Sequence, residues 1–596
     1  MGKNYLYNLP DLLRAIQEKR TVYITEGEKD VETLGSIGLK GSTSAGSDWK
    51  EEYGPIFIGC EVVIFRDNDN AGFKYSQKVK YDIRPYAFSV KVVNPSNLDK
   101  GDVTDFLTKE GGTKESLFNL IEKTDTEYAG WVYHAKDGTP KVNIGLLAET
   151  VSKNMNYLIC RKQGDEKDLL YIFNGKIYER TNKNGLKAMI GQYIPPKIKT
   201  DANLNSVLGM ILADDSHCCN YLELNQNENL ICLENGVLNT DTWVVEEFSP
   251  YVKNTILYQV KYFPDKAYED YHLKWFPKYM KDLCSSADGT FNEEIYLLLQ
   301  EVGGLFISNI PVRKVKKAVI LFSSLGNTGK SILLQVLMSF LGIYAVKSLN
   351  LAELKPDNRF ILGDLIDYRL IVCGDESNAN IPDSSIFKRL TGGDPVKVEG
   401  KGKDGFTYVW NGGIMVACNG LPCFVDDKGG HLFERLLIIP LEHHIPKEER
   451  DVELLQKLLS EQEGIFHWFM DGLKRLQENG FRFTKCDEVD QIGEEYRKSV
   501  DNLYRFVQEN YVITGQYQDR ISKTAFDDKY TMWANQNEEV KKIAKRNIAD
   551  RLKKMGIVSN IGDVAGQRAI AVYRGIKPKE AEFKELNVEE KQTSPF

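Results

Sequence analysis

Short apolar runs that alternate with helix-like stretches mark the beginning of the chain. The apolar runs at residues 21–25, 61–65 and 88–93 are predicted strands, and residues 29–37 between the first two have a helical pattern. Strands separated by helices form parallel sheets whose faces are covered by those helices. Residues 1–125 are therefore predicted to form an α/β domain.

The same alternation returns in the middle of the chain. Four more apolar runs are predicted strands, at 318–322, 370–373, 413–418 and 436–439. The stretches between them are long enough for helices, so a second α/β domain with a parallel sheet is expected.

Two further regions differ in pattern. Residues 145–290 mix short helices and strands with glycine turns, and residues 471–577 are mostly helical and charged before a strand-like run at 569–573. The C-terminal tail is rich in Glu and Lys, which predicts disorder. The predicted fold class is thus a multidomain α/β protein, divided into residues 1–125, 126–290, 291–470, 471–577 and a tail of 578–596.

The composition is typical of a globular protein without a membrane segment. The chain has 596 residues and a formal net charge of −8. No run of about eighteen apolar residues is present, and the N-terminus lacks the apolar core of a signal peptide. The ten cysteines form no Cys-x-x-Cys pair, so reduced thiols in a cytoplasmic protein are expected. The negative net charge argues against a uniformly basic protein that coats nucleic acid. Any DNA contacts are therefore expected in local basic patches.

The strand at 318–322 runs into a glycine-containing loop and then into an apolar helical run. Strand, loop and helix in this order curl backbone N–H groups around phosphates. Lys330 is expected to reach the β- and γ-phosphates of ATP, and the Ser331 hydroxyl to help hold Mg²⁺. Ser324 stands where the usual pattern has its first glycine. The predicted nucleotide-binding residues are Gly326, Asn327, Thr328, Gly329, Lys330, Ser331 and Asp375.

Polar residues accompany each later strand of this domain. Asp375 can hold Mg²⁺ through water, and Glu376 can polarise the attacking water. Asn419 can bind the γ-phosphate or that water. Arg435, directly before the strand at 436–439, is a candidate arginine finger for the ATP of a neighbouring subunit. Each signal is unspecific by itself, but their order after a phosphate loop predicts an ATPase with Lys330, Glu376, Asn419 and Arg435 as catalytic residues.

The chain resembles the superfamily 3 helicases at these motifs, and most closely the phage, plasmid and poxvirus primase-helicases. The resemblance rests on Lys330-Ser331, Asp375-Glu376, Arg435 and the blocks Lys388-Arg389-Leu390-Thr391-Gly392-Gly393-Asp394 and Asn419-Gly420-Leu421-Pro422. It implies an AAA+ core that hydrolyses ATP with Mg²⁺ in a hexameric ring on single-stranded DNA. It also implies a pore hairpin in which Lys401 and Lys403 grip the DNA backbone, with an ordinary surface hairpin as the alternative. Residues 145–290 resemble the accessory domain that precedes these helicases.

Acidic residues follow two strands of the N-terminal domain. Glu26 comes directly after the strand at 21–25, and Asp67 and Asp69 come directly after the strand at 61–65. The carboxyl ends of adjacent parallel strands meet at one edge of a sheet, and carboxylates are ligands that Mg²⁺ prefers. The pattern resembles the Toprim domain of primases and topoisomerases, with Asp102 as a further metal-binding acid. A solvated acidic rim is the alternative, because Asp and Asn favour loops.

The Toprim resemblance implies Mg²⁺-dependent phosphodiester chemistry with Glu26 as a catalytic residue. Family primases carry a zinc-binding module ahead of this domain, whereas this sequence begins almost directly at it and has no cysteine before Cys60. The expectation is therefore weak or partner-dependent primer synthesis, or a domain that has kept only a structural role.

The most basic segment of the chain is 541–554. Ile543, Ile548 and Leu552 give it a partly apolar face, and strand-like residues follow. A basic helix in such a setting is typical of a winged-helix domain, whose helix enters a DNA groove. A solvated helix face is the alternative. The predicted DNA contacts of this segment are Lys541, Lys542, Lys545, Arg546, Arg551, Lys553 and Lys554.

Together these patterns predict a primase-helicase that replicates the DNA of a phage, plasmid or other mobile element. The expected partners are single- and double-stranded DNA, further copies of the chain in a homo-hexamer, and host replication proteins, without a membrane. Two alternatives remain open. One is a self-loading, origin-binding initiator helicase with an inactive Toprim domain, and the other is a Toprim nuclease with an ATPase motor.

Overall fold

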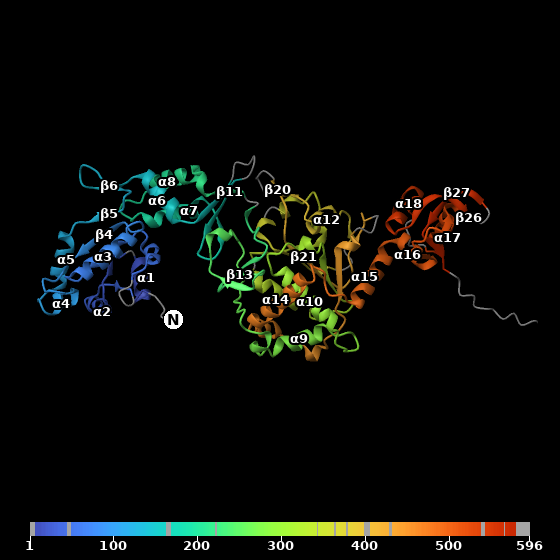
Figure 1. Ribbon diagram of the computed structural model, residues 1–596, viewed down its shortest axis with the longest axis horizontal. Coiled ribbons are helices and arrows are strands. Elements are labelled where there is room, and N and C mark those ends of the chain that lie inside the picture. Colours follow the sequence, from blue (N-terminus) through green and yellow to red (C-terminus); the bar gives the residue numbers. More distant parts are fainter. Residues whose placement is uncertain are drawn as a thin grey trace, which may run out of the picture. The chain divides into compact units, whose positions relative to one another are not determined.

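The chain divides into two compact units, residues 1–225 with 248–255, and residues 226–247 with 256–596. Figure 1 labels their elements in chain order. The computed structural model describes residues 6–18, 20–44, 49–161, 168–220, 223–342, 344–362, 365–376, 380–398, 406–427, 432–537, 543–564 and 567–579. Two α/β parts with parallel sheets confirm the predicted multidomain α/β class.

The first unit begins with a five-stranded sheet. Its order is β2-β1-β3-β4-β5, parallel except for the last strand. The strands predicted at 21–25, 61–65 and 88–93 are all present. The sheet consists of β1 (Val22–Ile24), β2 (Gly41–Ser42), β3 (Glu61–Phe65), β4 (Ser89–Val93) and β5 (Glu127–Tyr128).

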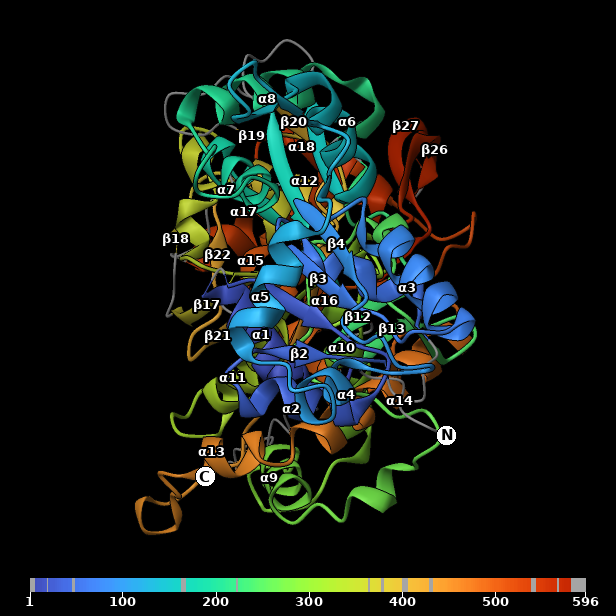
Figure 2. The same cartoon turned by 90° about the vertical axis from the view of Figure 1, so that its left-hand side faces the viewer.

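Helices cover both faces of this sheet. Val62 and Ile64 of β3 face a core shared with α1 (Leu9–Gln17) and α3 (Asn70–Ile83), whereas Val63 and Phe65 face a core shared with the other helices. Figure 2 shows α3 and α5 on opposite sides of β3 and β4. Alternate strand residues thus bury against alternate helix layers, as expected for a parallel sheet. The second layer contains α2 (Glu28–Ser36), α4 (Val103–Thr108) and α5 (Lys114–Lys123).

The rest of the first unit is a smaller mixed part. Its four-stranded sheet has the order β10-β9-β8-β11, and its helices share a core with β8 and β9. The sheet contains β8 (Tyr157–Arg161), β9 (Leu169–Phe173), β10 (Tyr178–Thr181) and β11 (Cys218–Asn220). The helices are α6 (Ile144–Asn154), α7 (Lys183–Tyr193) and α8 (Asp201–Ala213), and β6 (Val132–His134) pairs with β7 (Pro140–Val142).

The second unit is built around a five-stranded parallel sheet with β21 at its centre (Figure 1). The four strands predicted in this region are present, and β16 adds a fifth. The order is β16 (Val346–Ser348), β17 (Leu370–Glu376), β21 (Gly413–Cys418), β15 (Ala318–Phe322) and β23 (Leu436–Pro440). Because β21 lies between β15 and β17, the strand before the phosphate loop and the strand with the acidic pair are not neighbours.

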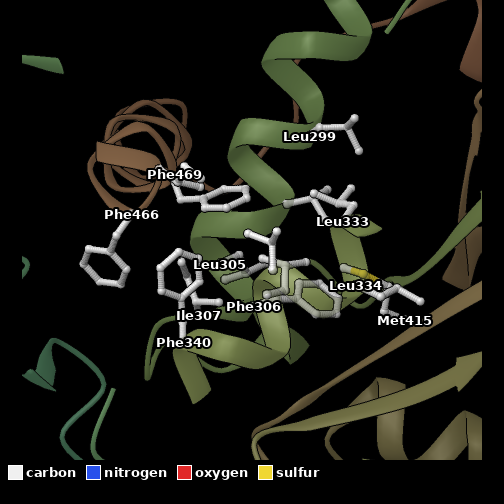
Figure 3. Packing of buried hydrophobic residues seen from close by; sticks show 14 of the residues in the cluster. Leu299, Leu305, Phe306, Ile307, Leu333, Leu334, Phe340, Met415, Phe466 and Phe469 are labelled. Atoms are coloured by element: carbon white, nitrogen blue, oxygen red, sulfur yellow. The ribbon is translucent and has the colours of Figure 1, made fainter. Parts of the chain in front are cut away.

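Helices that precede the sheet in the sequence and helices that follow it pack into one core with its strands. Phe466 and Phe469 of α14 lie close to Phe340 of α11 and Leu305 of α10 (Figure 3). This core includes α9 and both halves of α14, so the predicted boundaries at 290/291 and 470/471 fall within one packed body. The helices are α9 (Trp275–Leu283), α10 (Glu293–Phe306), α11 (Lys330–Leu341), α13 (Leu454–Leu459), α14 (Gln462–Glu478) and α15 (Asp487–Val500).

The crossing of α10 and α14 requires glycine on α10. A Cβ atom at Gly304 would overlap the Phe469 carbonyl oxygen, and one at Gly303 would overlap the Phe469 ring. Gly304→Ala is therefore expected to lower the free energy of unfolding by about 3 kcal/mol, because backbone cannot yield as a side chain can. Thermal denaturation of the full chain measures this. Gly493→Ala in α15 is the control and should be nearly neutral, since its Cβ would make only ordinary contacts. Equal melting temperatures for the two variants would contradict the close approach.

The second unit also contains several small antiparallel and parallel sheets. One three-stranded antiparallel sheet contains β12 (Leu230–Leu233), β13 (Gly236–Asn239) and β14 (Val244–Glu246), and β18 (Asn380–Ile381) pairs with β22 (Cys423–Phe424). The helix α12 (Ser385–Gly392) leads to an antiparallel hairpin of β19 (Val396–Val398) and β20 (Phe406–Tyr408).

The C-terminal part combines helices with two short antiparallel sheets around its own core. The strand predicted at 569–573 lies within β27, but β28 extends to Pro578, where the disordered tail was expected to begin; residues 580–596 lie outside the described residues. The elements are α16 (Asn502–Asn510), β24 (Tyr511–Ile513), β25 (Arg520–Ser522), α17 (Lys523–Gln536), α18 (Lys545–Lys554), β26 (Val558–Val564), β27 (Gln567–Arg574) and β28 (Ile576–Pro578). Within the described ranges, no helix has the length and apolar character needed to cross a membrane.

Candidate functional site

The phosphate loop adopts a tight turn between β15 and α11. Asn327 and Gly329 have φ angles of 62° and 93°, and α11 starts at Lys330 with Gly329 as its N-cap. Gly329 is the residue that tolerates this backbone best, because it has no Cβ. The N-terminus of α11 therefore faces the loop, which is an anion-binding arrangement.

Lys330 lies buried beside this turn, with 7% of its surface exposed. Its Nζ donates hydrogen bonds to Thr328 Oγ1 at 3.3 Å and to Asn419 Oδ1 at 3.0 Å. Asn419 follows β21, which pairs directly with β15. The sheet order thus brings together two residues, Lys330 and Asn419, that lie 89 positions apart in sequence.

A cavity of about 360 Å³ opens at this point. The predicted nucleotide-binding residues from Gly326 to Ser331 all line it, together with Ile332 and with Ala417, Cys418 and Asn419. Polar groups therefore converge on a hollow at the carboxyl edge of a parallel sheet, the edge where such folds bind ligands.

The backbone of Asp375 and Glu376 ends β17 at the same edge. Glu376 is the register partner of Cys418, after an irregularity that follows Cys373. The acidic pair therefore lies one strand away from Asn419. The side chains of Asp375 and Glu376 lie outside what the structure describes.

The outer side of the phosphate loop has contacts that the sequence analysis missed. The Tyr279 hydroxyl of α9 donates to the Gly329 carbonyl at 3.0 Å, and His444 Nδ1 lies 2.8 Å from the Gly326 carbonyl. The backbone N–H of Ile445 donates to the Asn327 carbonyl at 3.1 Å. No local motif marks these residues, because each reaches the loop only through the folded chain.

Arg435 is held within its own chain. Its Nη1 donates to the Lys388 carbonyl at 2.6 Å and to Thr391 Oγ1 at 3.2 Å. Both acceptors, the Lys388 carbonyl and the Thr391 hydroxyl, belong to α12, so Arg435 is bonded to this helix of its own chain. The hairpin that follows α12 is present as β19 and β20, but its tip at 399–405, with Lys401 and Lys403, lies outside the described residues.

The N-terminal acidic residues converge as the strand pattern predicts. Glu26 follows β1 and Asp67 follows β3, and the two strands pair in parallel with Ile24 opposite Ile64. Glu26 Oε2 is buried and has no hydrogen-bond partner among the described residues. A buried carboxylate oxygen without a donor is costly, so this atom is suited to a cation.

The electrostatics of this site reflect crowded negative charge. Burial, and then the charges of Glu26, Asp30, Asp102 and Asp69, raise the pKa of Asp67 to about 7. Burial, and then Asp69 and Asp30, raise the pKa of Glu26 as well. The charges that act most strongly on Asp67 are all negative, which is typical of carboxylates that bind a metal.

Asp69 and Asp102 have structural bonds as well. Asp69 caps α3 by accepting from Gly72 N at 2.7 Å, and Asp102 caps α4 by accepting from Asp105 N at 2.6 Å while it pairs with Lys29 at 3.3 Å. In the described part of the chain, no three His, Cys, Asp or Glu side chains already stand in a metal-ligating arrangement.

Asp30 is a member of the acidic group that the sequence analysis missed. It is 4% exposed and accepts from the Thr104 hydroxyl at 2.6 Å. Its position in the sequence, four residues after Glu26 and in the first turn of α2, is the signal that could have found it.

In the described part of the basic segment near the C-terminus, the helix α18 begins at Lys545. Ile548 and Leu552 are buried in the domain core, as its apolar face predicted. Arg551 pairs with Asp501 at 2.6 Å and points into the domain, whereas Lys553 and Lys554 are exposed. Lys541 and Lys542 lie outside the described residues, as do the side chains of Lys545 and Arg546.

Similarity to known proteins is limited. A family model described as a family of unknown function (DUF5906) matches residues 321–435, from the phosphate-loop strand to Arg435. No curated protein matches the chain. Among solved structures, an A-form apo structure of the NrS-1 C-terminal region is 11% identical, with 72% of this chain and 99% of that chain covered and a TM-score of 0.37. An apo structure of the NrS-1 C-terminal region (305–718) is also 11% identical, with 72% and 98% covered and a TM-score of 0.34.

Proposed function

We propose that this chain is an ATP-driven DNA helicase of a phage or other mobile-element replication system, with a Toprim-like N-terminal domain that performs Mg²⁺-dependent primer synthesis. One observation supports the motor above all others. Lys330 and Asn419 meet in a cavity that the phosphate loop lines, next to the strand that ends in Asp375 and Glu376. Phosphoryl transfer requires a phosphate loop, a polar residue and an acidic pair close to one another. Here the loop follows β15, the polar residue Asn419 follows β21, and the acidic pair ends β17.

Each residue has a role in this proposal. The N–H groups of the loop and Lys330 bind the β- and γ-phosphates, and Asn419 positions the γ-phosphate or the attacking water. Ser331 and Asp375 would hold Mg²⁺, which neutralises phosphate charge. Glu376 acts as the base that polarises water.

DNA contacts are proposed for the hairpin and for the C-terminal domain. Lys401 and Lys403 would grip single-stranded DNA in the pore of a hexamer, and α18 of a winged-helix-like domain would bind duplex through Lys553 and Lys554. Arg551 is not among the proposed DNA contacts of α18, because its ion pair with Asp501 holds the guanidinium inside the domain. The affinity of both contacts should fall with salt, since phosphate binding releases counterions.

A forked duplex tests the motor and the hairpin together. The wild-type chain should separate the strands only with ATP and Mg²⁺. Lys401→Ala with Lys403→Ala should lose unwinding at least tenfold and retain duplex binding, because only the pore contact is removed. Lys474→Ala with Lys498→Ala removes the same charge from exposed helix positions and is the control. If the wild-type chain neither hydrolysed ATP nor separated the strands of the fork, the proposed helicase function would be wrong.

Arg435 is proposed to act on the ATP of a neighbouring subunit, which requires its guanidinium to leave the Lys388 carbonyl and the Thr391 hydroxyl of α12. Arg435→Ala should bind ATP and hydrolyse it at least tenfold more slowly. Mixing it with Lys330→Ala protein should restore part of the ATPase rate, because a mixed interface pairs an intact loop with an intact arginine. Mixtures that stay inactive at all ratios would instead show that Arg435 acts only within its own chain.

The N-terminal site is proposed to hold Mg²⁺ through Glu26, Asp67, Asp69 and Asp102. The unpartnered Glu26 oxygen and the crowded charge around Asp67 support this assignment. Such metal ions would activate a 3′-hydroxyl and stabilise the leaving oxygen. Incubation with single-stranded DNA and labelled nucleotides distinguishes the alternatives: new short oligonucleotides indicate a primase, shortened substrate a nuclease, and neither an initiator whose Toprim-like domain is inactive.

A further inference from the structure

The carbonyl groups of the phosphate loop are held on the side away from the cavity. The Gly326 carbonyl accepts from His444, the Asn327 carbonyl from the Ile445 N–H, and the Gly329 carbonyl from the Tyr279 hydroxyl. Since a carbonyl oxygen only accepts, Nδ1 of His444 carries the hydrogen in this contact. The Gly329 carbonyl also accepts from the Ile332 and Leu333 N–H groups in the first turn of α11. His444 and Ile445 therefore fix two peptide groups of the loop from outside, and Tyr279 adds a third bond where the loop enters the helix.

This arrangement bears directly on phosphate binding. A peptide group presents its N–H on one side and its carbonyl oxygen on the other, so a carbonyl that turns inward would place a negative dipole end against phosphate oxygens. Bonds that hold the carbonyls outward keep the N–H groups facing the cavity before any ligand arrives. Binding then loses less free energy to ordering the loop.

Tyr279 is the most rigid of these supports. It is 3% exposed, and a Cβ at Gly329 would lie 3.2 Å from its ring, so the ring packs against the loop as the hydroxyl bonds to it. Burial raises the pKa of Tyr279 well above its ordinary value, so the hydroxyl remains a donor. Its helix is fixed in turn, because the Glu461 carboxylate accepts from the N–H groups of Trp275 and Phe276 at the start of α9.

We propose that Tyr279 and His444 are positioning residues that preset the phosphate loop for the polyphosphate of a nucleotide. The inference rests on the proposed function, because it assigns the support of the same nucleotide site. Neither residue lines the cavity, so both act through the loop and not on the ligand.

A matched pair of hydroxyl deletions tests Tyr279. Tyr279→Phe removes only the oxygen that bonds to Gly329. Tyr258→Phe is the control, because it removes an equally buried hydroxyl of the same core that bonds to Asn309 at 3.2 Å. ADP binding by calorimetry and steady-state ATP hydrolysis are measured for the full chain. We expect Tyr279→Phe to raise the Kd for ADP and the KM for ATP about fivefold, with kcat changed less than twofold, and Tyr258→Phe to leave all three unchanged.

His444 supplies an independent variant at an exposed position. His444→Ala should also raise the Kd for ADP about fivefold, and the adjacent His443→Ala should not. If the wild type binds ADP but Tyr279→Phe matches Tyr258→Phe and His444→Ala matches His443→Ala, the positioning role is overturned while the nucleotide site stands. If the wild type itself does not bind ADP, the proposed function fails and this inference fails with it.

Discussion

Lys330→Ala is expected to reduce ATP hydrolysis by about 10²–10³-fold or more and to abolish unwinding. Lys330 is buried at the edge of the cavity and bonds to Asn419 at 3.0 Å, so its charge lies where the β- and γ-phosphates are proposed to bind. Neither Thr328 nor Asn419 carries a charge that could replace it. A radiolabelled or coupled ATPase assay with single-stranded DNA measures the loss.

The control for this experiment is Lys347→Ala in β16, which removes a lysine of the same sheet that does not line the cavity. It should hydrolyse ATP at the wild-type rate. Thermal denaturation of both variants separates a local loss of charge from unfolding, since both should melt close to the wild type. A Lys330→Ala protein that is folded and retains wild-type turnover would exclude this cavity as the ATPase site.

Asp67→Asn is expected to stabilise the first unit in the absence of divalent metal at pH 8 and to remove its response to Mg²⁺. The pKa of Asp67 is raised to about 7 from an ordinary value of 3.8, so the folded state binds the proton more tightly than the unfolded state. Stability from this group is therefore full below pH 3.8 and is lost as the pH rises to about 7. The Asp67 side chain is partly exposed, so solvent screens its charge. We therefore expect Asp67→Asn to recover only about 1–2 kcal/mol of the stability that the wild type loses at high pH.

The metal response gives the second half of this result. Mg²⁺ should raise the melting temperature of the wild type at pH 8, because it neutralises the crowded carboxylates, and should have little effect on Asp67→Asn. Glu122→Gln, an exposed acidic position on α5, is the control and should behave as the wild type. A wild type that shows no Mg²⁺ response, together with a variant of unchanged stability, would favour the solvated acidic rim over a metal site.

The strands were predictable because each is short, apolar and bounded by polar residues. The predicted run at 61–65 coincides with β3, and the run at 413–418 coincides with β21. Parallel pairing then places the residues after each strand at a common edge, so the convergence of Glu26 with Asp67 follows from the strand pattern alone. The sequence likewise indicated that Lys330 and Asn419 belong to one site.

Residues that act through tertiary contacts could not be predicted in the same way. Tyr279 reaches the phosphate loop from a helix 50 positions upstream, and nothing around it differs from an ordinary core tyrosine. Arg551 looked like any other cation of a basic helix until Asp501 was found beside it. The boundary expected at 470/471 lies inside α14, because this helix is continuous there and buries residues in the same core on both sides of it.

The strand β23 joins two regions of the second unit that lie far apart in the sequence, the phosphate loop and α12. Arg435 at its start bonds to α12, the helix that leads into the hairpin, while Glu442 and His444 beyond its end bond to Ser324 and Gly326 of the phosphate loop. Five strand residues span only about 17 Å and cannot stretch, because the backbone is already extended and is bonded to β15. The strand therefore couples the two ends mechanically: a displacement of the phosphate loop is expected to move Arg435 and α12 of the same chain as well.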